Sequence, residues 1–277
     1  GRLAGRFPQG IGQCYIVAVY PFQRRGKAMF RNVLLAVLFT ILSVNAFAEG
    51  IKVGVSGDYP PLIYKQDGRI VGIEADNAKA VGELLGQKMI MVEMPFEKLI
   101  PALRAGEIDV IMAGLSVTPE RSKLVTFTEP YMEIGQMAIM STEKVGQFSK
   151  PWSIYQEGVR VGVEPGTTGA AFAQEKLPDA TVSSYANSEE AFAALRQDEI
   201  DLYIHDAPTS WTLATSSDNA DLISLYHPLT DEQLAWAVRK DDPALAGALN
   251  QALRTLKNNG TLRYIFSRWI PVTVEVR

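Results

Sequence analysis

Residues 102–109 read ALRAGEID and residues 194–201 read ALRQDEID, so the two stretches share six of eight positions. Each stretch closes a helical pattern and leads into a short apolar run, at residues 110–112 in the first case and 202–204 in the second. A helix that runs into a β-rich segment is the returning part of a β-α-β unit. The repeated stretch therefore predicts two α/β lobes of related construction.

A second pair of similar segments precedes these stretches in the same order. IKVGV occupies residues 51–55, and VRVGV occupies residues 159–163. Each half thus begins with a strand, passes through helices and ends with a helix-then-strand unit, which favours mostly parallel sheets flanked by helices. Chance similarity between two ordinary α/β units is the alternative, and the shared order argues against it.

Capping residues and apolar spacing predict the remaining elements. Thr118 and Pro119 mark the start of a helix, Gly86 ends one, and Ser188 caps another. The predicted helices cover residues 75–85, 189–197, 243–256 and 261–269, and the predicted strands cover residues 89–93, 136–140 and 233–239. The last two strands have no clear helical partner, so they would suit crossings between the lobes.

Charge is unevenly distributed along the chain of 277 residues. Residues 1–48 carry six basic residues and no acid, which leaves 21 Lys+Arg against 31 Asp+Glu, a net charge of −10, for residues 49–277. An acidic body argues against nucleic-acid binding, which relies on a basic patch. The only cysteine, Cys14, lies in the front segment, so residues 49–277 can form neither a disulfide nor a thiolate metal site.

Residues 29–48 have the features of a secretory signal peptide. Arg31 supplies the positive start, residues 33–44 form a largely apolar run, and AFA ending at Ala48 is a small-x-small cleavage site. Twelve residues are too few to span a bilayer core of about 30 Å. We expect a periplasmic protein cleaved after Ala48, with a buried or amphipathic N-terminal helix as the alternative. Residues 1–28 precede a plausible initiator methionine and are expected to be a non-native or upstream extension.

The aligned repeats identify four strand ends, at Ser56, Gly114, Glu164 and Asp206. Ligands of open α/β sheets bind beyond the carboxyl ends of the strands, so two lobes that face each other would bring these positions around one cleft. Turns or helix starts follow the strand ends, and their backbone N–H groups could hold an anion. These segments are residues 58–61, 116–121 and 166–169.

Several segments, spread over residues 50–270, resemble the periplasmic amino-acid-binding proteins of ABC importers, the bacterial extracellular solute-binding proteins of family 3. The most specific is the Ser-x-Thr-x-x-Arg pattern that ends at Arg121 and is followed by Phe-Thr-x-Pro-Tyr. The matching segments are residues 57–61, 96–103, 107–121, 127–131 and 162–168, and the strand that ends in Asp206.

The resemblance implies an α/β, two-lobed periplasmic-binding-protein fold whose lobes are joined by a hinge with two crossings. Residues 49–138 together with 234–277 would form lobe 1, and residues 139–233 would form lobe 2. Lobe 1 would regain the C-terminal helices after the second crossing. Closure around a ligand would then be a hinge motion.

The resemblance also implies roles for single residues. Arg121 matches the arginine that holds the ligand α-carboxylate, a group that a guanidinium fork binds bidentately. Asp206 matches the acceptor for the α-ammonium. Hydroxyl or backbone partners of the carboxylate would be Ser116 and Thr168, and aromatic walls would be Tyr59 and Phe96. Ordinary structural roles remain alternatives: Asp206 and Thr168 could cap helices, Phe96 could be core, and Arg121 and Tyr59 could lie at the surface.

Two cleft positions, Gly114 and Ser56, depart from the pattern of many relatives, which carry an acidic or other polar residue where Ser56 stands. Gly114 stands where many carry a serine, so it can offer only backbone groups. Glu164 lies where relatives vary with the ligand, and it could contact a polar ligand side chain or form an interlobe latch with Ser56 or a nearby N–H. His205 is expected to point to the opposite sheet face from Asp206 and to be structural.

We therefore expect a binding protein that captures an amino acid, most simply a polar one, and delivers it to an inner-membrane ABC permease. We expect a monomer with no cofactor, no metal, no catalytic group and no nucleic-acid partner. One alternative is an exported enzyme on the same scaffold, such as a cyclohexadienyl dehydratase, with Glu164 as the general acid. The other is the ligand-binding module of a sensor.

Overall fold

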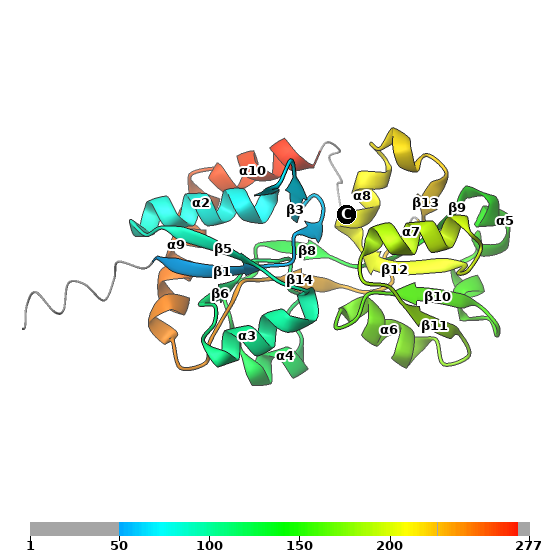
Figure 1. Cartoon of the computed structure of the whole chain (residues 1–277), viewed down its shortest axis with the longest axis horizontal. Coiled ribbons are helices and arrows are strands. Elements are labelled where there is room, and N and C mark those ends of the chain that lie inside the picture. The colour runs from blue at the N-terminus through cyan, green and yellow to red at the C-terminus, as the bar shows by residue number, and fades with distance from the viewer. Residues whose placement is uncertain (1–49, 226, 271–277) are drawn as a thin grey trace, which may run out of the picture. The chain divides into compact units, whose positions relative to one another are not determined.

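The computed structural model describes residues 50–225 and 227–270 (Figure 1). Several predictions fall outside this range: the signal peptide at residues 29–48, its cleavage after Ala48, Cys14 and the extension at residues 1–28. Within the described residues, the strands form two five-stranded sheets, a three-stranded sheet and a two-stranded ribbon.

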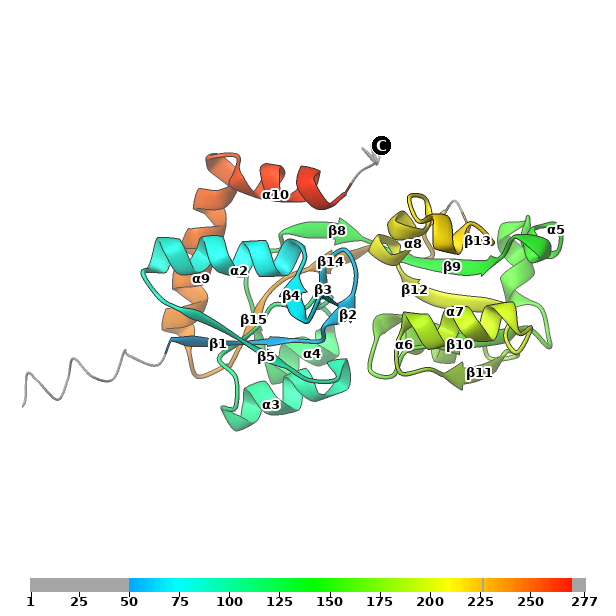
Figure 2. The same ribbon diagram turned by 45° about the horizontal axis from the view of Figure 1, so that its top comes forward.

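The first five-stranded sheet has the order β5-β1-β6-β15-β7. Strands β1 and β5 are parallel, as are β1 and β6, whereas β15 is antiparallel to both of its neighbours. In Figures 1 and 2, α2 and α10 lie on one side of this sheet and α3 on the other. The bounds are β1 Ile51–Val55, β5 Met89–Glu93, β6 Val110–Ile111, β7 Thr126–Phe127, β15 Ala237–Val238, α2 Ile73–Leu85, α3 Leu99–Ala105, α4 Pro119–Leu124, α9 Pro243–Asn258 and α10 Thr261–Trp269.

The second five-stranded sheet has the order β11-β10-β12-β9-β13, and β9 is antiparallel to both of its neighbours. Helices α6, α7 and α8 lie against its strands (Figures 1 and 2). The bounds are β9 Gln136–Ser141, β10 Arg160–Val163, β11 Thr181–Ser184, β12 Leu202–Asp206, β13 Leu222–Ser224, α5 Val145–Phe148, α6 Thr168–Lys176, α7 Ser188–Arg196 and α8 Ala207–Leu213.

The two sheets share one topology, because β1, β5, β6, β15 and β7 occupy the places of β10, β11, β12, β9 and β13. In each sheet the fourth strand runs against the other strands, so four of the five described strands point the same way. The predicted α/β fold with two mostly parallel sheets is confirmed. The sequence repeat is thus the visible part of a repeat in strand order.

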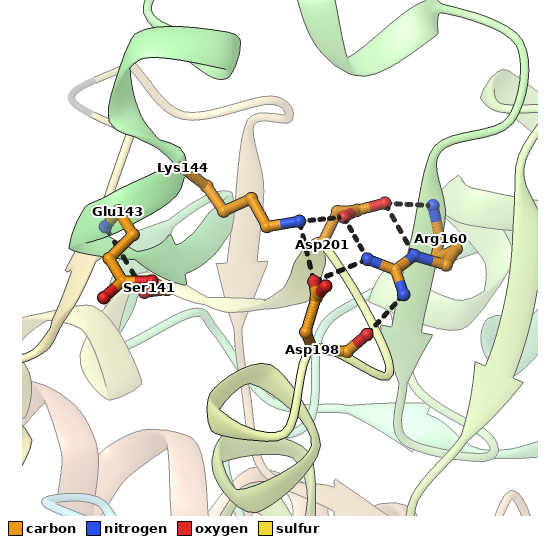
Figure 3. Close-up of polar contacts among 6 residues, drawn as sticks. All are labelled: Ser141, Glu143, Lys144, Arg160, Asp198 and Asp201. Carbon is orange, nitrogen blue, oxygen red and sulfur yellow. Dashed lines mark hydrogen bonds and ion pairs between the residues drawn. The ribbon is translucent and has the colours of Figure 1, made fainter.

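The last residue of each repeated stretch anchors the neighbouring strand. The Lys52 N–H donates to Asp109 Oδ2 at 2.9 Å, and the Arg160 N–H donates to Asp201 Oδ2 at the same distance. Asp201 also accepts from the Lys144 ammonium at 2.8 Å and from the Arg160 guanidinium, in a cluster that includes Asp198 (Figure 3). The repeated aspartate therefore secures the start of β1 or β10, far along the strands from their carboxyl ends.

The chain passes between the two large sheets through strands β8, Met132–Ile134, and β14, Glu232–Leu234, which pair antiparallel. Strand β8 is followed by β9 of the second sheet, and β14 is followed by β15 of the first. The single strand expected at residues 233–239 is therefore two strands, because its first part pairs with β8 and its second part with β6 and β7. The crossings approach closely: a Cβ on Gly135 would lie 2.1 Å from the Thr230 carbonyl oxygen.

The second sheet is buried on both faces, because alternate residues of β12 pack into two different cores. Leu202 and Ile204 pack with Phe172 of α6 in one core, and Tyr203 packs with Phe192 of α7 in another. The first sheet has a single larger core that includes the fully buried Trp236. The remaining described elements are β2 Asp58–Tyr59, β3 Ile63–Gln66, β4 Arg69–Val71, η2 Phe96–Lys98, η3 Thr142–Lys144, η4 Pro151–Tyr155 and η5 Ser217–Asn219.

Helix ends follow the predicted signals with small shifts. Thr118 accepts from the Arg121 N–H at 3.1 Å and caps α4, as predicted. The cap of α7 is Asn187, not Ser188, and the cap of α6 is Thr167. Thr168 is the first residue of α6 and does not cap it, so the alternative role of Thr168 as a helix cap is wrong.

Candidate functional site

All eight residues that the sequence singled out line one pocket. Three of them, Gly114, Glu164 and Asp206, are predicted strand ends, and the structure brings these together from both large sheets. Ser56, the fourth predicted strand end, also lines the pocket, and Thr167 and His205, to which no ligand contact was assigned, complete the lining. The predicted residues in the lining are Tyr59, Phe96, Gly114, Ser116, Arg121, Glu164, Thr168 and Asp206.

Arg121 lies in the first turns of α4, where the Thr118 cap holds its backbone. Its guanidinium donates to the Ser116 carbonyl at 2.8 Å and to the Gly166 carbonyl at 2.9 Å, so it contacts residues that follow β6 and β10. The guanidinium carbon lies 5.6 Å from the centre of the Phe96 ring, within cation–π range. Burial lowers the pKa of Arg121, and the charges of Asp206 and Glu232 act against that shift.

Asp206 ends β12 and begins α8, but its carboxylate makes no helix-capping hydrogen bond. The Tyr59 hydroxyl donates to Oδ2 at 2.6 Å, and the Gln136 amide donates to Oδ1. Burial raises the pKa of Asp206, and these donors together with His205 oppose the shift. A carboxylate oxygen can accept more than one hydrogen bond, so Asp206 retains acceptor capacity toward the pocket.

Thr168 belongs to a polar network that reaches the second crossing. Its hydroxyl donates to Glu232 Oε2 at 2.8 Å and accepts from the Gln136 amide at 3.0 Å. Gln136 also lies 3.1 Å from Glu232 Oε1. Gln136 and Glu232 were not predicted, and they connect the pocket wall with β9 and β14.

Glu164, the strand end after β10, is 8% exposed and faces His205. Its Oε2 atom lies 3.3 Å from Nε2 of His205, while Nδ1 of His205 lies 2.8 Å from the Thr209 hydroxyl. Neither of the partners expected for Glu164, Ser56 or a nearby N–H, is the observed one. The structure therefore adds a third possibility to the two that the sequence left open.

His205 shares the sheet face of Tyr203, whose ring lies 5.3 Å away, as strand alternation predicts. This placement on the face opposite Asp206 does not take His205 out of the pocket, whose lining includes it. Strand β12 ends at the next residue, so the pocket wraps around the strand end and reaches side chains of both faces. Burial lowers the pKa of His205, but the hydrogen bond with Glu164 and the charges of Asp206, Glu164 and Asp58 outweigh it and raise the pKa.

Gly114 has a φ of +67°, and a Cβ there would lie 2.7 Å from both Leu62 and the Tyr59 ring. A serine at this position would thus collide with the aromatic wall. The Gly114 N–H donates to Glu74 Oε1 at 3.1 Å, which leaves the Gly114 carbonyl as the backbone group available to the pocket.

Glu74, 1% exposed, supports the pocket from behind. Besides the Gly114 N–H it accepts from the Tyr131 hydroxyl at 2.6 Å, Trp236 Nε1 at 2.9 Å and Asn77 at 3.3 Å. Burial raises the pKa of Glu74, and these four donors oppose the shift. Three of the four donors lie 40, 57 and 162 residues away in the sequence, so no local pattern could have identified this carboxylate.

The residues that the structure describes contain no group of three or more His, Cys, Asp or Glu side chains able to hold a metal ion. In the same part of the chain, no helix combines the length and apolarity needed to cross a membrane.

Comparison with known proteins identifies the family of the chain. The family model described as bacterial extracellular solute-binding proteins, family 3, matches residues 51–272. The ABC transporter arginine-binding protein 1 of Escherichia coli K12 is 33% identical over 88% of this chain and 100% of that relative. Two solved structures cover about as much. An ancestral arginine-binding protein bound to arginine has a TM-score of 0.74 and 31% identity over 80% of this chain and 99% of its own. An ancestral amino-acid-binding protein, a precursor of cyclohexadienyl dehydratase, has a TM-score of 0.74 and 32% identity over 79% and 95%.

Proposed function

The chain belongs to the bacterial extracellular solute-binding proteins, family 3, and we propose that it is the component of an ABC importer that binds a polar amino acid. One observation carries the proposal: a guanidinium, that of Arg121, and a carboxylate, that of Asp206, line the same pocket. They come from segments attached to different sheets. A free amino acid carries the complementary pair of charges on one carbon.

The α-carboxylate is assigned to Arg121. Its side chain already donates to two carbonyl oxygens, and it has five N–H groups in a planar fork, so donors remain for a carboxylate. A charge-assisted bond of this kind contributes about 1.5–3 kcal/mol. The Ser116 and Thr168 hydroxyl groups, which line the same pocket, are assigned as further donors to the carboxylate.

The α-ammonium is assigned to Asp206 and to the Gly114 carbonyl. Both are acceptors, and both are buried in the pocket wall. Desolvating an ammonium without acceptors would be costly, so its three N–H groups need such partners. These two groups account for two of the three N–H groups of the ammonium, and no residue is assigned to the third.

The side chain of the ligand is assigned to the region between Tyr59, Phe96 and Glu164. The aromatic rings suit the aliphatic stem of a long side chain, and Glu164 supplies a carboxylate beyond the α-amino subsite. Arg121 and Asp206 neutralise the two main-chain charges of the ligand, so Glu164 leaves an excess negative charge when His205 is neutral. That excess favours arginine, lysine or ornithine over leucine or phenylalanine.

We further propose that the ligand is enclosed by a hinge motion of two lobes, residues 49–138 with 234–277 and residues 139–233. Since β9, Gln136–Ser141, belongs to the second sheet, we move the first division from residue 138 to just before Gln136. The closed protein would deliver the ligand to an inner-membrane permease. It would act as a monomer. We also propose export to the periplasm with cleavage after Ala48, in keeping with a relative that is an arginine-binding periplasmic protein of Mannheimia haemolytica.

The proposal is tested by isothermal titration calorimetry on protein stripped of ligand by unfolding and refolding. The ligands are the twenty amino acids, ornithine and citrulline. We expect a basic or amide amino acid to bind, and Arg121→Ala to abolish binding without loss of folding. Arg104→Ala, which changes an exposed arginine of α3, is the matched control. Absence of binding by every amino acid, or near-normal binding by Arg121→Ala, would overturn the proposal.

A further inference from the structure

The partner of Glu164 is an ionisable ring that is itself held in place. His205 lies between the Glu164 carboxylate, 3.3 Å from Nε2, and the Thr209 hydroxyl, 2.8 Å from Nδ1. Thr209 lies one helical turn further along, in α8, and is 2% exposed. His205 and Glu164 are 6% and 8% exposed. Both ring nitrogens are therefore occupied in a site that excludes most water.

The chemistry of these groups fixes the hydrogen positions. An ionised carboxylate can only accept, so Nε2 must carry a hydrogen to bond Glu164. In the neutral ring, Nδ1 is then an acceptor, and the Thr209 hydroxyl must donate to it. In the charged ring both nitrogens donate, and the hydroxyl can turn to accept. The Thr209 hydroxyl can therefore hydrogen-bond Nδ1 in both protonation states of His205. In both states Nε2–H of His205 donates to Glu164.

The bond from His205 uses only Oε2 of Glu164. Oε1 has no hydrogen-bond partner among the interactions of the described residues, and Glu164 is one of the residues that line the pocket. A carboxylate held through one oxygen presents the other in a defined direction. His205 thereby restricts where Glu164 can meet a ligand side chain.

The environment of His205 is acidic on several sides. The groups that face it are Asp58 and Tyr59 from β2, Glu164 from the end of β10, and Tyr203 and Asp206 from β12. The ring centroids of Tyr59 and His205 lie 5.2 Å apart at an interplanar angle of 76°. Together with the hydrogen bond from Glu164, these carboxylates raise the pKa of His205 in spite of its burial.

Asp58 is a second titratable group beside His205. Burial and the charge of Glu164 raise the pKa of Asp58 to about 6. Asp58 does not line the pocket, whereas His205 does. Any pH effect on binding has to be divided between these two groups by separate variants.

We propose that His205 is a positioning and specificity-determining residue, which directs Glu164 toward the ligand side chain and makes the preference for a cationic over an amide side chain depend on proton binding. With neutral His205, the His205–Glu164 pair carries a charge of −1 and attracts a guanidinium or ammonium. With protonated His205, the pair is neutral overall. A neutral amide side chain meets little electrostatic difference between the two states.

The inference rests on the proposed function and predicts a measurable ratio. Arginine and glutamine share their α-carboxylate and α-ammonium, so the ratio of their affinities cancels the titration of groups that contact only those parts. One unit of charge a few ångströms away in a buried site changes affinity by about tenfold or more. We expect the arginine-to-glutamine affinity ratio to fall by about that factor between pH 8 and pH 5.5.

Calorimetry with arginine and glutamine at pH 5.5, 6.5, 7.5 and 8.0 measures this ratio. Three proteins are compared: wild type, His205→Gln and Asp58→Asn. A glutamine at position 205 can still donate to Glu164 but cannot titrate, so we expect a ratio nearly independent of pH. Asp58→Asn removes the other titrating group, and we expect it to keep a pH-dependent ratio with a shifted midpoint. Circular dichroism melts show whether each variant is folded.

A second measurement observes the proton directly. The chain has two histidines, so the imidazole signal of His205 can be assigned by its loss in His205→Gln. Linkage is reciprocal: a ligand that prefers the neutral ring must lower the pKa of that ring. We expect saturating arginine to lower the titration midpoint of His205 by about one pH unit for a tenfold coupling, and glutamine to lower it by much less.

The outcomes separate this inference from the proposed function. If no amino acid binds the wild type, the proposed function fails and the inference with it. If amino acids bind but the ratio is independent of pH, only the inference fails. It also fails if His205→Gln keeps the pH dependence, or if Asp58→Asn abolishes it, since Asp58 would then be the controlling group.

Discussion

The Tyr59 hydroxyl lies 2.6 Å from Oδ2 of Asp206, although 147 residues separate them in the sequence. The bond joins β2, which follows the first strand of one sheet, to the carboxyl end of β12 in the other. Burial and the neighbouring Asp206 charge hold the pKa of Tyr59 well above its usual range, so the phenol stays a donor. The acceptor assigned to the ligand ammonium is thus oriented by a residue that also forms the pocket wall.

Tyr59→Phe tests this relationship. The substitution removes a donor from a buried carboxylate and leaves the ring in place. A hydrogen bond to a charged group contributes about 1.5–3 kcal/mol, so we expect the free energy of unfolding to fall by about that amount at pH 7.5. Urea denaturation measures it. Tyr155→Phe, at an exposed position of η4, is the control, and equal stability of the two variants would contradict the assigned bond.

Arg121→Lys keeps the charge but removes the planar fork. The ammonium cannot hold the Ser116 and Gly166 carbonyl groups and also bind a carboxylate bidentately. We therefore expect the affinity for the bound amino acid to fall at least tenfold, a loss of about 1.4 kcal/mol. Calorimetry provides the test, with Arg104→Lys as the control. Near-normal affinity would show that Arg121 acts only as a point charge.

Glu164→Gln separates the roles left open for this residue. If Glu164 meets a ligand cation, a basic amino acid should lose more than about tenfold in affinity, or 1.4 kcal/mol, and neutral amino acids should be spared. Competition binding with arginine, lysine, glutamine and citrulline shows the pattern. A uniform loss across all ligands would instead indicate a latch, and tight binding of leucine or phenylalanine by the wild type would refute a polar ligand.

Asp201 should contribute stability that acid removes. Burial raises the pKa of Asp201, but hydrogen bonds from Arg160 and Lys144 outweigh it and hold the pKa at about 2, below its ordinary value of 3.8. A depressed pKa in the folded state stabilises the protein above pH 4. The contribution, about 2 kcal/mol, is lost as the pH falls through 2.

Denaturation of the wild type and Asp201→Asn at pH 7 and at pH 2.5 measures this contribution. We expect the stability difference between the two proteins to be larger at pH 7. Asp198→Asn is a stringent control, because Asp198 pairs with the same Lys144 and Arg160 but its side chain is 67% exposed. Equal effects of the two substitutions at pH 7 would contradict the special role of the buried aspartate.

The internal repeat explains why much of the pocket could be found without a structure. Aligning the repeats located four strand ends, and all four line the pocket because the two sheets share one strand order. The other five predicted residues, Tyr59, Phe96, Ser116, Arg121 and Thr168, came from family resemblance and lie in the same wall. Their roles toward a ligand stay predictions.

Some pocket residues escaped prediction, for two physical reasons. His205 was set aside because strand alternation puts it on the face opposite Asp206, and alternation says nothing about a pocket that surrounds the end of a strand. Glu74, Gln136 and Glu232 act through partners far away in sequence. Local sequence patterns indicate helix caps and strand or helix periodicity. Hydrogen bonds between residues far apart in the sequence depend on the completed fold.

The buried carboxylate of Glu74 has a mechanical consequence. It binds Gly114 in the pocket wall, Tyr131 just before β8 and Trp236 just after β14, so both crossings are anchored where they meet the first sheet. A pivot cannot lie at an anchored point. Any swing of the second sheet must bend the crossings further along, where the Gly135 backbone closely approaches Thr230. In the proposed hinge motion, the pocket wall and the bases of the two crossings would move together, and strain from an ill-fitting ligand would act on the crossings near Gly135.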